Sequence, residues 1–111
     1  MTEITIEPAN GMVVVRAGGA VIVESSDAVI LRESGYDPVY YFPREDASMF
    51  LDASAKRTTC PHKGEASYFH IVTKSGPIED AAWSYETPIN GMEVIRERIA
   101  FGHEKVAVEE L

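Results

Sequence analysis

Short runs of β-branched residues alternate with turn-forming residues along this chain, at intervals of about ten positions, which is typical of meandering antiparallel sheets. In the first half the runs cover Ile4–Glu7, Met12–Arg16, Val21–Glu24 and Ala28–Arg32. The pairs Asn10-Gly11 and Gly18-Gly19 lie between runs and suit tight hairpin turns. Because Val13, Val14 and Val15 are consecutively apolar, that strand is predicted to be buried on both faces.

The second half adds strands and two short helical segments. The predicted strands cover Pro38–Phe42, Ala55–Thr59, Ala66–Thr73, Ala81–Tyr85, Ile99–Phe101 and Val106–Val108. A helical turn is expected over 44–51, after Pro43, and another over about 90–96, because proline is accepted at the start of a helix. The pattern therefore predicts a mainly β protein, with compact curled antiparallel sheets and one or two short helices.

Length and cysteine content limit the class of protein. The 111 residues, 45% of them hydrophobic, are expected to form one domain over 1–111. No window approaches the roughly 18 apolar residues of a membrane span, and no leader pattern is recognised, so a cytoplasmic location is expected. Cys60 is the only cysteine, which excludes an internal disulfide and a multi-thiolate zinc site.

The charge of the chain bears on its partners. Acidic residues outnumber basic ones by 18 to 10, giving a net charge of −8, which works against binding to nucleic acid or an anionic membrane. Four basic side chains nevertheless gather around Cys60 in sequence: Lys56, Arg57, His62 and Lys63. They predict either a local positive pocket or solvated loop charges.

The segment from Thr59 to Tyr68 contains the candidates for chemistry. A cysteine beside cations favours its thiolate, but a lone cysteine also serves as a small buried hydrophobe. Lys63-Gly64 either lets the backbone approach an anion or merely makes a turn. Cys60 and His62 have no paired ligand spacing with the other histidines, so neither a metal nor another cofactor is expected.

Aromatic residues concentrate in the middle and later strands. Strand alternation puts Trp83 and Tyr85 on one face of their strand. It likewise puts Tyr40 and Phe42 on one face of theirs. Such faces serve as core, but tyrosine hydroxyls need partners when buried. If the tyrosines converge near Lys63, they would form a pocket of mixed polarity, the ordinary form of a small-ligand site.

Three strings of this sequence resemble the bacterial family called domain of unknown function 427. They run over Val39–Asp46, Thr59–Tyr68 and Ala81–Pro88, and the closing Ile99–Phe101 run also looks like the family's. The resemblance implies a tent-like antiparallel β fold of the Mss4-like group, without the paired zinc-binding cysteines of its relatives. The family is also likened to nucleotidyltransferases. The paired acidic residues and the glycine-serine loop of those enzymes are not recognisable in this sequence. The matching motif positions are Tyr41, Pro43, Asp46, Cys60, Lys63, Gly64, Tyr68, Trp83 and Tyr85.

The family resemblance supplies no activity, and three hypotheses remain. The first is binding of a small anionic molecule in an aromatic pocket near the Cys60–Gly64 turn. Its ligand-binding residues would be Tyr41, Lys63, Gly64, Tyr68, Trp83 and Tyr85. The second is an enzyme with Cys60 as nucleophile or Lys63 as electrostatic stabiliser, in which His62 or Asp46 moves protons. The third is a structural role, in which exposed aromatics and an edge strand form a homodimer.

Overall fold

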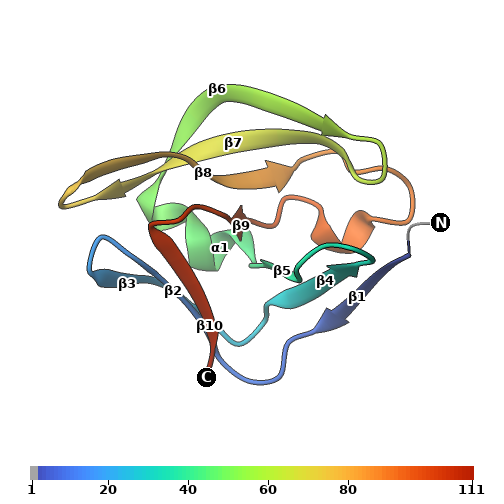
Figure 1. Cartoon of the computed structure of the whole chain (residues 1–111), viewed down its shortest axis with the longest axis horizontal. Coiled ribbons are helices and arrows are strands. Elements are labelled where there is room, and N and C mark those ends of the chain that lie inside the picture. The colour runs from blue at the N-terminus through green and yellow to red at the C-terminus, as the bar shows by residue number, and fades with distance from the viewer. Residues whose placement is uncertain (1–2) are drawn as a thin grey trace.

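The structure, a computed structural model, describes residues 3–111, and most of its regular secondary structure is antiparallel strand (Figure 1). Its strands are β1 (Ile4–Pro8), β2 (Val13–Ala17), β3 (Ala20–Ser25), β4 (Val29–Glu33), β5 (Val39–Tyr41), β6 (Leu51–Cys60), β7 (Gly64–Thr73), β8 (Gly76–Tyr85), β9 (Ala100–Phe101) and β10 (Val106–Glu110). The helical elements are α1 (Arg44–Ala47) and the 3-10 turns η1 (Ser48–Phe50) and η2 (Glu93–Ile95). Within the described part, no helix has the length and apolar character to cross a bilayer.

The strands form three antiparallel sheets, in the orders β1-β4-β5, β10-β2-β3 and β6-β7-β8-β9. Figure 1 shows the third sheet curling over the other two, with α1 between them. The prediction of a mainly β fold of antiparallel sheets is confirmed, and the strands of residues 3–111 do not close into a barrel.

The two glycine turns have different roles. Gly18-Gly19 makes the predicted hairpin between β2 and β3, and both glycines have positive φ angles, 59° and 78°. Asn10-Gly11 does not make a hairpin, because β1 pairs with β4 and β2 pairs with β3 and β10. That turn instead carries the chain from one sheet to the next.

The helices are shorter, and two strands longer, than the sequence predicts. The segment after Pro43 has one α-helical turn and one 3-10 turn, and only Glu93–Ile95 of the second predicted helix is helical. Strands β6 and β8 begin at Leu51 and Gly76, well before the predicted starts. Polar residues and register shifts interrupt the alternation of apolar and polar residues in these strands. Asp80, for example, lies within β8 with a φ of 53°.

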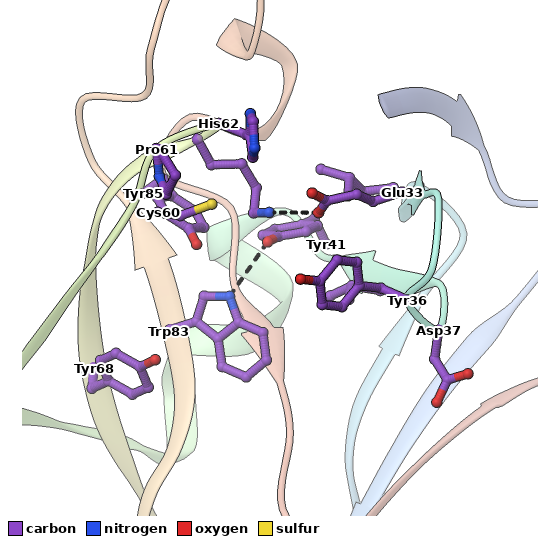
Figure 2. A pocket seen from close by; sticks show the side chains of 13 residues that line it. Glu33, Tyr36, Asp37, Tyr41, Cys60, Pro61, His62, Tyr68, Trp83 and Tyr85 are labelled. Carbon is purple, nitrogen blue, oxygen red and sulfur yellow. Dashed lines mark hydrogen bonds and ion pairs between the residues drawn. The ribbon is translucent and has the colours of Figure 1, made fainter. Parts of the chain in front are cut away.

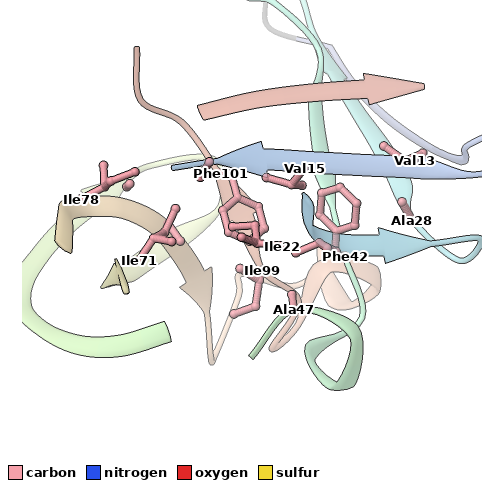
Figure 3. Packing of buried hydrophobic residues seen from close by; sticks show 14 residues of the cluster. Val13, Val15, Ile22, Ala28, Phe42, Ala47, Ile71, Ile78, Ile99 and Phe101 are labelled. Carbon is pink, nitrogen blue, oxygen red and sulfur yellow. The ribbon is translucent and has the colours of Figure 1, made fainter. Parts of the chain in front are cut away.

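The main core lies between the β10-β2-β3 sheet and the inner face of the β6–β9 sheet (Figure 3). Val13, Val15, Phe42, Ile71 and Ile99 are fully buried in it. The rings of Phe42 and Phe101 meet edge to face, with centroids 5.8 Å apart. Val14, on the opposite face of β2, is buried as well, which confirms the prediction that this strand is buried on both faces.

A second apolar cluster lies next to the point where a β-bridge joins the β1-β4-β5 sheet to the β6–β9 sheet. Phe42 and Ile99 exchange backbone hydrogen bonds of 2.8 and 2.9 Å, linking the end of β5 to the start of β9. Since successive residues of a strand face opposite ways, Phe42 enters the main core and Tyr41 enters the second cluster with Tyr85 and Ile95. The candidate site lies beside this second cluster.

Candidate functional site

A pocket of about 410 Å³ opens between the β1-β4-β5 sheet and the β6–β7 hairpin tip (Figure 2). Its lining residues come from five strands, β4 to β8, from the β4–β5 connection and from the hairpin tip. They are Leu31, Glu33, Tyr36, Asp37, Val39, Tyr41, Cys60, Pro61, His62, Lys63, Tyr68, Trp83 and Tyr85. The pocket therefore combines aromatic rings with a small number of charged and polar groups, as small-molecule sites commonly do.

Strand pairing sets the aromatic wall. Tyr68 lies opposite Trp83 in the β7–β8 register, and their ring centroids are 6.1 Å apart. Tyr85 lies opposite Ala66 in the same pair of strands, and Trp83 lies opposite Ala100 of β9. Because alanine fills little space, large rings alternate with small side chains on this face, and part of each ring borders the pocket.

Tyr41 and Trp83 connect the two sheets at the floor of the pocket. The indole Nε1 of Trp83 donates a hydrogen bond of 3.3 Å to the Tyr41 hydroxyl. Burial raises the pKa of Tyr41 to about 12, although this hydrogen bond acts in the opposite direction. Tyr41 is therefore neutral at physiological pH, and its own hydroxyl hydrogen remains available for donation.

Tyr85 presents its hydroxyl to the open space of the pocket. The residue as a whole is only 5% exposed, and its hydroxyl forms no hydrogen bond with another side chain of residues 3–111. Because no fully buried polar side-chain atom in this part of the chain lacks a partner, the hydroxyl itself must be accessible from the pocket. Figure 2 shows this hydroxyl next to Cys60, at the pocket's edge. Burial, followed by its interaction with Tyr41, raises the pKa of Tyr85, so this hydroxyl also stays protonated.

An ion pair closes one end of the pocket. The Lys63 ammonium donates to Glu33 Oε1 at 3.0 Å, and the two side chains are 13% and 9% exposed. Burial acts to lower the pKa of Lys63, but the hydrogen bond to Glu33 and the interactions with Cys60 outweigh it and raise the pKa. The ammonium is thus charged, and most of its charge is balanced by Glu33.

The hairpin tip is held inward by backbone contacts. The Lys63 amide donates to the Cys60 carbonyl at 3.2 Å, and the Ile89 amide donates to the Lys63 carbonyl at 2.9 Å. Gly64 has a φ of 119°, and a Cβ there would lie 3.4 Å from the Thr87 carbonyl oxygen. Glycine at this position therefore lets the tip pack against the segment after β8, which positions Lys63 over the pocket.

The basic residues around Cys60 divide into two groups. His62 and Lys63 line the pocket, His62 from an exposed position at its rim. The Lys56 ammonium instead lies over the Tyr68 ring, 4.7 Å from its centroid, and Arg57 donates to backbone carbonyls of its own strand. Only half of the cluster thus contributes to the pocket.

Most of the residues selected from sequence meet in this pocket, but two do not. Tyr41, Cys60, His62, Lys63, Tyr68, Trp83 and Tyr85 all line it. Gly64 acts through the turn and is absent from the lining. Asp46 accepts a 2.7 Å hydrogen bond from the Ser25 hydroxyl, outside the pocket, so the structure does not support a proton-transfer role for Asp46 with Cys60.

Sequence reasoning missed the contribution of β4 and of the connection to β5. Glu33, Tyr36 and Asp37 line the pocket, and Figure 2 shows the Tyr36 ring facing it from the side opposite the β7–β8 wall. Each is an ordinary turn or strand-end residue in sequence. The one available signal was that Glu33 directly follows Arg32, the predicted end of the strand that begins at Ala28.

Fold and site together define a class of protein, a mainly antiparallel β domain with an aromatic pocket between two of its sheets. The chain belongs to the family described as a domain of unknown function, DUF427, whose model matches residues 5–110. The resemblance detected in the sequence strings is therefore confirmed. No curated protein matches the sequence.

Proposed function

We propose that this domain binds a small, ring-containing molecule that is rich in hydrogen-bond acceptors, with the ring against Tyr41, Tyr68, Trp83 and Tyr85. The observation that carries the proposal is the Tyr85 hydroxyl, which faces the pocket from a residue that is only 5% exposed and forms no hydrogen bond with another side chain of residues 3–111. Because this hydroxyl is free to donate into the pocket, an acceptor atom on a ligand would pair with it.

Three of the polar groups that face the pocket can donate hydrogen bonds to a ligand: the Tyr41 and Tyr85 hydroxyls and the Lys63 ammonium. The hydroxyls of Tyr41 and Tyr85 are protonated at neutral pH, and an ammonium has three N–H donors, of which Glu33 takes one from Lys63. A ligand carbonyl or carboxylate oxygen fits this set. Since Glu33 balances the Lys63 charge, a neutral or singly charged ligand is favoured over a multiply charged anion.

The size and walls of the pocket support the same class of ligand. Its volume of about 410 Å³ falls within the range of small-molecule sites. The tilted rings of Tyr68 and Trp83 offer apolar area on one side, and Tyr36 lies across from them. A planar ring would contact both sides while its acceptor oxygen reaches Tyr85.

Trp83 is the only tryptophan of the chain, so its emission reports on the pocket directly. We expect benzoate and benzamide to change this emission in a saturable way and benzylamine, which lacks an acceptor, to bind far more weakly. Tyr85→Phe is expected to weaken benzoate binding by about tenfold, because one hydrogen bond to the ligand is lost. The matched control is Tyr40→Phe, whose hydroxyl donates to Glu110 outside the pocket.

Two results would contradict the proposal. One is that none of these ring compounds perturbs Trp83. The other is that Tyr85→Phe binds benzoate as tightly as Tyr40→Phe does.

The two buried tyrosines of the pocket should differ in their effects on stability. Tyr41→Phe removes the acceptor of Trp83 Nε1 and should lower the free energy of unfolding by about 1 kcal/mol. Tyr85→Phe should change it by less than about 0.5 kcal/mol or raise it slightly, because no hydrogen bond to another side chain is broken. Urea unfolding of both variants tests this, and a larger loss for Tyr85→Phe would contradict the view that its hydroxyl is unpartnered.

A further inference from the structure

Cys60 packs against the second apolar cluster and also borders the pocket. It is the last residue of β6, it is half-buried, and it borders the pocket with Tyr41 and Tyr85. Figure 2 shows its sulfur directed into the pocket, next to the Tyr85 hydroxyl and toward Tyr41. A thiol in this position can meet a ligand that occupies the pocket.

Two further features point to a reacting partner for this thiol. Lys63 lies on the same hairpin tip as Cys60, and both side chains border the pocket. The Tyr85 side chain is 5% exposed, forms no hydrogen bond with another side chain of residues 3–111, and directs its hydroxyl into the pocket beside the sulfur. The Cys60 sulfur and the Tyr85 hydroxyl thus face the same space. This arrangement suits addition of the thiol to a C=C bond that is conjugated to a carbonyl group, because the hydroxyl can donate to the carbonyl oxygen.

We propose that Cys60 forms a thioether with α,β-unsaturated carbonyl compounds bound in this pocket, with Tyr85 donating to the carbonyl oxygen. The inference rests on the proposed function, because the pocket must first bind a ring bearing an acceptor oxygen. It adds a covalent step and names the ligand class as a cyclic enone or its close analogue.

The step balances without a co-reactant. The Cys60 thiolate forms an S–C bond with the β-carbon, and the C=C π pair moves to give an enolate whose oxygen accepts from Tyr85. The α-carbon then takes up one proton from water, replacing the proton that the thiol had released. The product is a saturated ketone carrying a thioether, and no oxidant or reductant is consumed.

The test uses cyclohex-2-enone as the reactive probe and intact-mass measurement as the readout. The folded chain at neutral pH is compared with the same chain in concentrated urea, where Cys60 keeps its sequence neighbours but loses the pocket. We expect one adduct per chain, forming at least about tenfold faster in the folded state because the pocket holds enone and thiolate together. Cys60→Ser should form none.

Tyr85→Phe distinguishes a positioned thiol from one that is merely accessible. At saturating enone this variant should add about tenfold more slowly, because the enolate oxygen loses its donor. Tyr40→Phe, outside the pocket, should react like the parent chain. An equal rate in folded and unfolded chains, or an unchanged rate in Tyr85→Phe, would overturn the inference.

The saturated analogue cyclohexanone separates this inference from the proposed function. If cyclohexanone perturbs Trp83 emission and cyclohex-2-enone does not add to Cys60, ring binding stands and the covalent step is wrong. If neither of these compounds nor benzoate perturbs Trp83 emission, both fail. If the enone adds while cyclohexanone leaves Trp83 unperturbed, the thiol reacts without prior binding of the enone and the covalent inference is contradicted, while the benzoate titration decides the proposed function.

Discussion

Replacing Lys63 by methionine is expected to lower the free energy of unfolding by about 3 kcal/mol or more, because it leaves a buried carboxylate without its partner. Glu33 is 9% exposed and pairs with Lys63 at 3.0 Å, so water cannot readily replace the ammonium. The methionine side chain keeps the length of the lysine stem, which limits the effect to the lost charge. Urea unfolding at neutral pH measures the change.

Two control proteins make this prediction specific to burial. The double variant Glu33→Leu/Lys63→Met should recover most of the loss, since replacing a buried ion pair by apolar groups is often neutral. The pair Arg32–Glu7 has a similar distance, 2.9 Å, but its side chains are 51% and 55% exposed. Arg32→Met should therefore cost less than about 1 kcal/mol. Equal losses in Arg32→Met and Lys63→Met would show that the Glu33–Lys63 pair is not buried in solution.

The sequence predicted the strands of the first half well because their alternation is undisturbed. Val13 to Val15 identified a strand buried on both faces, and Gly18-Gly19 identified a hairpin. The predicted strands of the long β6–β8 hairpins are too short, because register shifts there break the alternation with a period of two by which a strand is recognised in sequence. Propensity and periodicity describe regular strands, whereas shifts depend on tertiary packing.

The aromatic part of the candidate site could be predicted, and the polar part could not. Strand alternation correctly grouped Trp83 with Tyr85, because one strand fixes which residues share a face. Glu33 reaches Lys63 from a different sheet, 30 residues earlier in the chain, and no local pattern encodes that meeting. Its presence changes the expected ligand, because a paired ammonium is a weaker anion anchor than a free one.

The second large effect is expected at alkaline pH, where the folded chain should lose stability as the pH rises from about 10 to about 12. Burial raises the pKa of Tyr41 to about 12 from an ordinary value of 10.0, and the pKa of Tyr85 is also raised by burial. The pKa of Lys63 is raised because Glu33 and Cys60 outweigh burial. All three groups hold protons in the folded state that the unfolded chain releases first, so their contribution is intact below about pH 10 and is lost above it.

Tyr41 alone should account for about 3 kcal/mol of this loss, since two pKa units correspond to roughly that free energy. Urea midpoints followed by circular dichroism between pH 8 and pH 12 would give the slope of stability against pH. Tyr41→Phe starts from a lower stability but should show a distinctly shallower slope above pH 10, because the variant has no phenol at this position to ionise on unfolding. If parent and variant lose stability in parallel, the Tyr41 hydroxyl is not protected from ionisation. Water would then reach Tyr41 more readily than its 1% exposure in the structure indicates.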